Sequence, residues 1–164
     1  MVLNANSILN FIPGGLGDFG AKAQCGIDLS IKNIRRIKGG KIFQDGKEID
    51  EYEEVDSYIN ERGNRVFLLI NGVYSLEFDQ DIKLNNKHCA FVIGRSTTNR
   101  VGCIIRSSIF DPGFECPSIG ATMYVFSDNV IEIEKHSRLA QLLVLECEES
   151  EIYNGFYKGN KDLK

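Results

Sequence analysis

The chain has 164 residues, a hydrophobic content of 43% and a formal net charge of −4, which predicts one domain with a core of its own. The acidic balance argues against a protein that coats nucleic acid, because such a protein needs a basic face. No run of 18 apolar residues and no signal-peptide pattern occurs, so we expect no membrane partner and a cytoplasmic location, or the host cytoplasm if the source is viral.

The first third of the chain predicts a helical turn, a strand and a tight turn. Asn6 or Ser7 can cap a short helical turn, which Pro13 ends. Residues 23–31 alternate enough between apolar and polar side chains to predict a strand. Gly39-Gly40 then predicts a turn.

The middle of the chain predicts a loop followed by a hairpin. Residues 45–61 are acidic and have no clear period, which predicts a long surface loop with room for one short strand. Two β-rich runs, residues 66–70 and 73–78, flank Asn71-Gly72, a pair that tolerates positive φ. This is the strongest hairpin signal in the sequence.

Short apolar runs separated by turn residues continue to residue 145. They are residues 90–93, 103–105, 121–126, 130–133 and 139–145. This spacing, with almost no helical period, predicts an all-β fold: a sandwich, a jelly roll or a distorted barrel. The polar tail from Glu146 onward is predicted either to be disordered or to order on contact.

The five cysteines predict reduced side chains rather than a metal or disulfide framework. Their number is odd, they are scattered, and no C-x-x-C spacing occurs. We expect them to act as small hydrophobic residues. Cys116, which lies in a turn after Phe114, is the candidate for reactivity.

Residues 94–102 predict a polyphosphate site. Arg95 and Ser96 follow a predicted strand, and Arg100 lies five residues on. Arginine presents a planar donor fork that matches phosphate oxygens, and serine adds a hydroxyl. A solvated loop would explain Arg95 and Ser96 alone. Arg100 in the same stretch, and Asp111 close behind, favour the functional interpretation.

Asp111 is the candidate general base, and Phe114 the candidate sugar contact. Asp111 precedes Pro112-Gly113, so it either starts a turn through its own side chain or deprotonates a water that attacks phosphorus beside a divalent ion. Phe114 either packs in the core or lies flat on a sugar, where it leaves no room for a 2′-hydroxyl.

Two polar residues in apolar surroundings require partners. Gln141 interrupts an apolar run, and its amide needs hydrogen bonds, which the backbone or a ligand could supply. Asp28 is a further carboxylate beside Gly26. Neither histidine has a neighbour at metal-ligand spacing, and the zinc-deaminase signature and the Walker A loop are both absent from the sequence.

Four segments, in this order, resemble the motifs of the dUTPase and dCTP deaminase superfamily. They are residues 23–29, 94–102, 109–116 and 136–144, with residues 153–160 resembling a degenerate fifth motif. The resemblance implies a distorted β jelly roll over residues 1–150 and a C-terminal arm over residues 151–164. It also implies a homotrimer whose active sites lie between subunits and are closed by this arm.

The resemblance also implies roles for single residues. Asp111 matches the aspartate that activates water, and Phe114 matches the aromatic residue that packs on deoxyribose. Asp28 matches an aspartate near Mg²⁺ and its waters, where the metal is held mainly by the triphosphate. The substrate-binding positions that it implies are Arg95, Ser96, Thr97, Arg100, Phe114, Gln141, Phe156, Tyr157 and Lys158.

The deaminase branch needs an acid that this chain lacks. The deaminases carry a glutamate ten residues after the motif-three aspartate, where this chain has Ala121, and residues 117–126 contain no acid. Without it, addition of water to C4 and loss of ammonia lack their proton carrier. The residues therefore favour a dUTP diphosphatase, which converts dUTP and water to dUMP and pyrophosphate.

Three alternatives stay open at this point. They are a dCTP deaminase, alone or bifunctional; a non-catalytic nucleotide-binding or regulatory descendant; and a jelly roll without a nucleotide site. Cys116 and His136 stand where glycine is usual in the superfamily, which supports the second alternative. The tail mixes features of both enzymes, and this mixture resembles the archaeal and phage-like branch.

Overall fold

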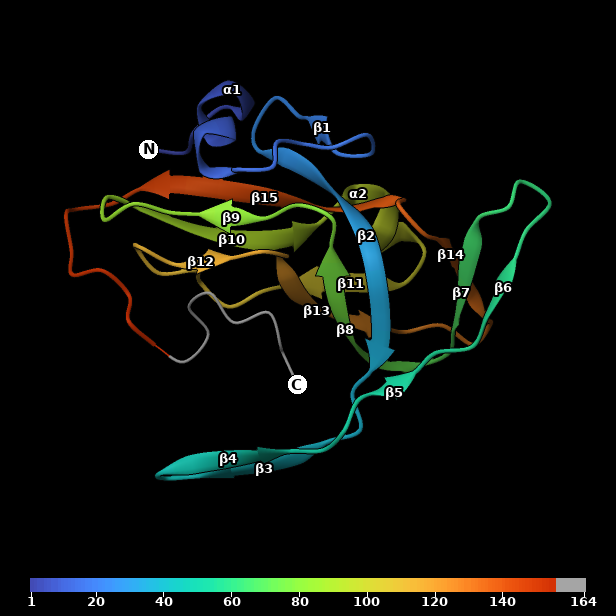
Figure 1. The fold of residues 1–164 in the computed structure, drawn as a ribbon. Coiled ribbons are helices and arrows are strands. Elements are labelled where there is room, and N and C mark those ends of the chain that lie inside the picture. The colour runs from blue at the N-terminus through green and yellow to red at the C-terminus, as the bar shows by residue number, and fades with distance from the viewer. Residues whose placement is uncertain (156–164) are drawn as a thin grey trace.

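The fold is almost entirely β-strand in the computed structural model, which describes residues 1–155 (Figure 1). The helical elements of this range are α1 (Ala5–Ile8), the 3₁₀ turn η1 (Leu9–Phe11) and α2 (Ser96–Arg100). The strands are β1 (Ala21–Lys22), β2 (Ile27–Arg36), β3 (Gly40–Phe43), β4 (Gly46–Ile49), β5 (Glu53–Glu54), β6 (Ser57–Ile59), β7 (Arg65–Leu69), β8 (Gly72–Phe78), β9 (Ile82–Lys83), β10 (His88–Gly94), β11 (Cys103–Arg106), β12 (Glu115–Cys116), β13 (Gly120–Val125), β14 (Ile131–Glu134) and β15 (Arg138–Glu146). The all-β prediction is confirmed.

The main sheet closes on itself because β2 pairs at both of its ends. The strand order is β1-β2-β15-β10-β11-β13-β8, and β8 pairs back onto β2. The first half of β2 pairs with β15, and its second half, from Ile31 onward, pairs with β8 after a register shift. Such an irregularity bends a strand and lets it pass from one partner to another. The result is a distorted barrel with the core inside.

Strand β2 carries both core and polar side chains. Ile27, Leu29 and Ile31 are fully buried, as the alternation predicts. Asp28 and Ser30 point to the other face and are also buried, so each needs a partner there. The strand begins at Ile27 rather than at residue 23, and β1 precedes it separately.

The N-terminal helical turn is confirmed, but its predicted cap is wrong. Asn4 caps α1, since its side chain accepts a hydrogen bond of 3.0 Å from the Ser7 backbone N–H. Asn6 and Ser7 lie inside the helix. The turn buries Ile8 completely.

The predicted hairpin around Asn71-Gly72 is wrong, although both of its strands exist. β7 pairs with β6 and β14, whereas β8 pairs with β13 and β2. Buried Tyr74 stabilises the corner between them, because its hydroxyl accepts from the Ile70 N–H at 3.1 Å and donates to the Ile70 carbonyl at 2.6 Å. Asn71-Gly72 is compatible with a hairpin turn, but β7 and β8 each pair with other strands instead.

The acidic region is more ordered than predicted. Residues 45–61 contain β4, β5 and β6 instead of a loop with one strand. β3 and β4 form a hairpin that projects from the body (Figure 1). Within residues 1–155, no helix is long and apolar enough to span a membrane.

Candidate functional site

Arg95, Asp28 and Gln141 form a polar group that we call the Arg95 cluster. The Arg95 guanidinium lies 3.4 Å from the Asp28 carboxylate and donates a 2.9 Å hydrogen bond to the Arg138 carbonyl. The Gln141 amide donates to Asp28 at 3.0 Å. The partner of Gln141 is thus a carboxylate and not the backbone. The Asp28 side chain is 8% exposed and that of Arg95 32%, so the cluster reaches the surface through the arginine.

Local structure around α2 fixes this cluster. The Arg95 N–H donates to the Leu139 carbonyl at 3.0 Å, and the buried Thr98 hydroxyl donates to the same carbonyl at 2.7 Å. Both contacts tie the start of α2 to β15, where Gln141 lies. The other predicted positions on α2, Ser96, Thr97 and Arg100, are exposed.

Asp111 begins a tight turn at the surface. The Phe114 N–H donates to the Asp111 carbonyl at 3.0 Å, and Gly113 has φ +79°, a conformation that favours glycine. The Gly113 N–H donates to the Asn85 carbonyl at 3.0 Å, which holds the turn against the body. Within residues 1–155, no hydrogen bond reaches the Asp111 carboxylate, and the side chain is exposed. This carboxylate is available to a ligand or a water.

The surroundings of Phe114 are compatible with both of its predicted roles, and its contact with a sugar stays a prediction. Its ring stacks on Phe110 with centroids 5.1 Å apart, and Tyr153 packs against it at 5.7 Å. The Tyr153 N–H also donates to the Pro112 carbonyl at 2.7 Å. Phe114 is half-buried and also lines a cavity, so part of the ring packs in the core and part is open to a ligand.

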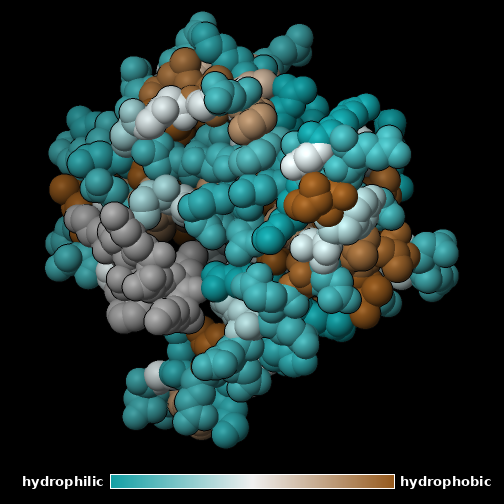
Figure 2. Space-filling model, turned by 45° about the vertical axis from the view of Figure 1, so that its right-hand side comes forward, coloured by the Kyte–Doolittle hydropathy of each residue, from teal (hydrophilic) through white to brown (hydrophobic). Residues whose placement is uncertain are grey.

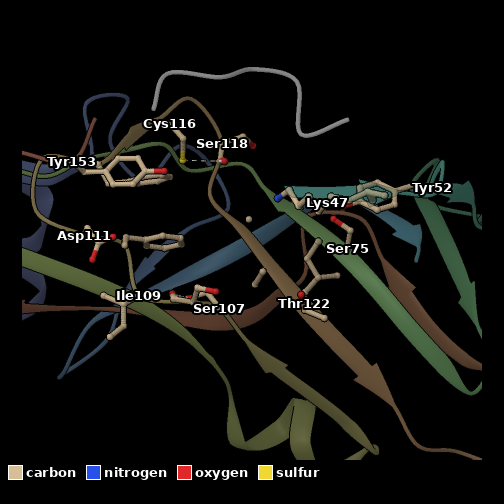
Figure 3. Close-up of a pocket in the computed structure, with 17 residues that line it drawn as sticks. Lys47, Tyr52, Ser75, Ser107, Ile109, Asp111, Cys116, Ser118, Thr122 and Tyr153 are labelled. Atoms are coloured by element: carbon tan, nitrogen blue, oxygen red, sulfur yellow. Dashed lines mark hydrogen bonds between the residues drawn. The ribbon is translucent and has the colours of Figure 1, made fainter. Parts of the chain in front are cut away.

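The cavity beside Asp111 has a volume of about 680 Å³, in the range of small-molecule sites. Figure 3 shows Asp111 and Tyr153 on one side of it and Lys47, Tyr52 and Ser75 on the other. The described lining residues are Lys47, Ile49, Tyr52, Ser75, Leu76, Ser107, Ser108, Ile109, Phe110, Asp111, Phe114, Cys116, Ser118, Gly120, Ala121, Thr122 and Tyr153.

Sequence reasoning missed most of these residues. Ser107 and Ser108 carry no motif; the Ser107 hydroxyl accepts from the Val92 N–H at 2.8 Å and donates to the Ser108 carbonyl at 2.6 Å. Lys47 and Tyr52 lay in the segment predicted as a loop, and no local pattern indicated that this segment reaches the cavity.

The Arg95 cluster and Asp111 lie apart within one chain. Phe110 pairs with Ala90, whereas Arg95 follows the other end of β10. Five residues of extended strand span roughly 17 Å. The described cavity lining includes Asp111 and Phe114 but not Arg95 or Gln141. The structure therefore brings the predicted residues together as two groups, not as one.

His136 and Cys116, which stand where glycine is usual in the superfamily, differ from each other in structure. His136 has φ +67°, so it adopts the left-handed conformation that glycine favours. Its ring lies 2.8 Å from the Asp79 carboxylate and stacks on Phe19 at 4.1 Å. Cys116 is buried and its thiol donates to the Ser118 carbonyl at 3.3 Å. Burial raises the pKa of the Cys116 thiol to about 11, so the predicted reactivity is wrong.

The remaining predictions concern a metal and the tail. Within the described residues, no three or more His, Cys, Asp or Glu side chains gather to hold a metal ion. Asp28, the one predicted metal position, is paired with Arg95, and its contact with a metal stays a prediction. Phe156, Tyr157 and Lys158 lie outside the described residues, which leaves their predicted contacts as predictions.

Apolar side chains gather on one area of the surface, at the right of Figure 2. Ile104 on β11 and Phe126 are exposed large hydrophobic residues. Ile104 lies opposite Tyr124 on β13, and the Tyr124 ring stacks on that of Phe126 with centroids 6.5 Å apart. Val101 precedes the same edge and is half exposed. Neighbouring exposed apolar side chains of this kind are a common feature of protein contact surfaces.

Residues 16–147 match the family described as dCTP deaminase-like. A deoxyuridine 5′-triphosphate nucleotidohydrolase of Methanocaldococcus jannaschii is 30% identical over 161 residues, which cover 97% of this chain and 99% of the relative. A probable enzyme of the same name from Aeropyrum pernix is 30% identical over 142 residues, or 85% of this chain and 86% of the relative.

A solved structure supports the fold. The 2′-deoxycytidine 5′-triphosphate deaminase of Agrobacterium tumefaciens superposes with a TM-score of 0.61 at 15% identity. The match covers 87% of this chain, and this chain spans about half, 47%, of that protein. At this identity the likeness concerns the fold alone.

Proposed function

The chain belongs to the dCTP deaminase-like family, and we propose that it is a dUTP diphosphatase, which releases pyrophosphate from dUTP and leaves dUMP. The main support for the proposal is the distribution of carboxylates in the cavity. Among its described lining residues, Asp111 is the only carboxylate, and Ala121 occupies the position where a deaminase needs an acid. The cavity can activate a water at its Asp111 side, and it has no proton carrier for removing an amino group.

In the proposed reaction, Asp111 orients a water and takes its proton. The water oxygen attacks the α-phosphorus, the bond from that phosphorus to the bridging oxygen breaks, and pyrophosphate leaves. Because the Asp111 carboxylate is exposed and free of side-chain hydrogen bonds within residues 1–155, it can accept the proton without losing an internal contact. The ring of Phe114 would hold the deoxyribose beside it.

The Arg95 cluster is proposed to hold the phosphate chain. Arg95 presents its guanidinium at the surface while Asp28 and Gln141 fix its orientation from below. A pre-oriented planar donor fork binds phosphate oxygens with less loss of side-chain freedom. Ser96, Thr97 and Arg100 lie exposed on the adjoining helix, where they could add contacts.

A homotrimer would bring the two groups together. One chain holds them roughly 17 Å apart along β10, so the cluster of one copy has to face Asp111 of another. The exposed apolar area near Ile104 and Phe126 supports such contacts between copies. Residues 151–164 are proposed to be the arm that closes the site, and Tyr153 already lies against Phe114.

Mg²⁺ is the proposed cofactor. The absence of a cage of ligating side chains among residues 1–155 fits an ion that arrives on the triphosphate and keeps its waters. Asp28 is the residue proposed to contact it, through water. When bound, the ion would neutralise charge on the phosphate oxygens.

The decisive experiment incubates the protein with dUTP and with dCTP in Mg²⁺ and measures pyrophosphate and ammonia separately. We expect pyrophosphate from dUTP and no ammonia from dCTP. Ammonia from dCTP would instead establish a deaminase, and nucleotide binding without either product would establish a non-catalytic descendant.

A further inference from the structure

The β3–β4 hairpin forms one wall of the cavity that holds Asp111. Lys47 and Ile49, two residues apart on β4, line the cavity together with Tyr52 just beyond the strand. Alternation along a strand places Lys47 and Ile49 on the same face. The rest of the hairpin projects into solvent, and in the described chain β3 and β4 pair only with each other (Figure 1).

The base of this hairpin is fixed beside the cavity. Arg35 on β2 pairs in register with Glu54 on β5, and its guanidinium lies 4.9 Å above the Tyr52 ring. Lys38 forms an ion pair of 3.1 Å with Glu53. These contacts hold the chain on both sides of the hairpin against β2, so Lys47 reaches the cavity from an anchored base.

The charges of the cavity lie at opposite sides. Among the described lining residues, Lys47 is the only cation and Asp111 the only anion. Figure 3 shows the Lys47 amine directed into the cavity from the side opposite Asp111. Ser75 and Thr122, which are paired in register on β8 and β13, supply hydroxyls near that end.

We propose that Lys47 reads the pyrimidine base and favours uracil over cytosine. The inference rests on the proposed function, which puts the α-phosphorus at Asp111 and the sugar on Phe114, so that the base extends toward Lys47. An ammonium group only donates hydrogen bonds. Uracil presents a carbonyl oxygen at position 4, which accepts, whereas cytosine presents an amino group there, which cannot.

The other polar side chains at the Lys47 end of the cavity do not favour cytosine over uracil. The hydroxyls of Ser75 and Thr122 can donate or accept, so they do not discriminate between the two bases. Asp111 is the only carboxylate among the described lining residues, and the proposed function places it at the α-phosphorus, so no lining carboxylate is assigned to accept from an amino group. Preference for uracil therefore depends on Lys47.

The test measures the affinities of α,β-imido-dUTP and α,β-imido-dCTP, which are not hydrolysed, for the full chain and for two variants. Lys47→Met keeps the length of the side chain but removes the donor. Lys41→Met is the matched control: Lys41 lies on the same hairpin opposite Glu48, on the other face from Lys47, and is paired with Glu48 at 3.3 Å.

We expect the wild type to prefer the dUTP analogue and Lys47→Met to lose about tenfold of that preference, as for one hydrogen bond to a charged group. Lys41→Met should keep the full preference. An unchanged preference in Lys47→Met, or no preference in the wild type, would overturn the inference. If the preference depends on Lys47 but the wild type releases no pyrophosphate from dUTP, the proposed reaction fails while the reading of the base stands.

Discussion

The Arg95 cluster and the Asp111 turn both carry a carboxylate, but they use it in opposite ways. Asp28 is buried, and both Arg95 and Gln141 point at it. Asp111 is exposed on a turn, and no hydrogen bond reaches its carboxylate within residues 1–155. The Asp28 carboxylate contacts both side chains inside the protein and so orients them. A carboxylate that is left open is suited to exchange protons with a water, and this difference supports the proposal of Asp111 as the general base.

The largest expected effect is on turnover in Asp111→Asn. The amide cannot take a proton from water, so kcat for pyrophosphate release should fall by about 10²–10⁴-fold. Binding of α,β-imido-dUTP should stay within about threefold, because phosphate contacts are assigned to the Arg95 cluster. Asp128→Asn, an exposed aspartate outside the cavity lining, is the control and should retain full activity. Equal turnover in Asp111→Asn and wild type would remove this residue from the mechanism.

Mixing two inactive variants tests whether the two regions meet across subunits. Arg95→Ala and Asp111→Asn each leave one group intact, so joint refolding should produce some sites with both groups. Random assembly of equal amounts gives intact pairs in roughly a quarter of sites, which should raise pyrophosphate release about 10²-fold above either variant alone. If the mixed sample stays at background while forming trimers, the two regions do not share one site.

The sequence predicted these two regions because their signals are local. A turn residue after an aspartate, and an arginine with hydroxyls after a strand, can be recognised within ten residues. The pairing of Gln141 with Asp28 joins residues 113 positions apart, and the register of β2 and β15 decides it. No local pattern carries that information.

The same reason explains the failures in the middle of the chain. Asn71-Gly72 suits a hairpin, but β7 and β8 join different sheets, because strand pairing depends on the whole topology. The acidic segment lacks an apolar period because its strands β4, β5 and β6 are exposed on both faces, so no alternation of buried and exposed side chains marks them in the sequence. Because the segment was predicted as a loop, the sequence did not identify Lys47 as a site residue.

The thiol of Cys116, which lines the cavity behind the Asp111 turn, should react slowly. Its pKa of about 11, raised from 9.0 by burial, leaves about a hundredfold less thiolate at pH 8 than an ordinary cysteine has. Since the unfolded chain loses this proton more easily, the thiol favours folding fully below pH 9, and this contribution is lost as the pH rises toward 11. Peptide mapping after iodoacetamide treatment should show exposed Cys25 modified first. Similar rates for both cysteines in folded protein would mean that this side of the cavity is open.

The smallest expected effect is on the free energy of unfolding, when aspartate is replaced by asparagine in each of the two regions. Asp28→Asn keeps the shape of the side chain but removes its charge and turns one acceptor into a donor, so Arg95 loses its ion pair and either Arg95 or Gln141 faces a donor. Because Arg95 is partly exposed and can be solvated, the free energy of unfolding should fall by only about 1–2 kcal/mol. Asp111→Asn, at an exposed carboxylate, should leave it unchanged within about 0.5 kcal/mol. Urea denaturation of both variants measures this. A loss of stability in Asp111→Asn as large as in Asp28→Asn would show that Asp111 also holds the structure together, and the contrast between a positioning carboxylate and a reactive one would then fail.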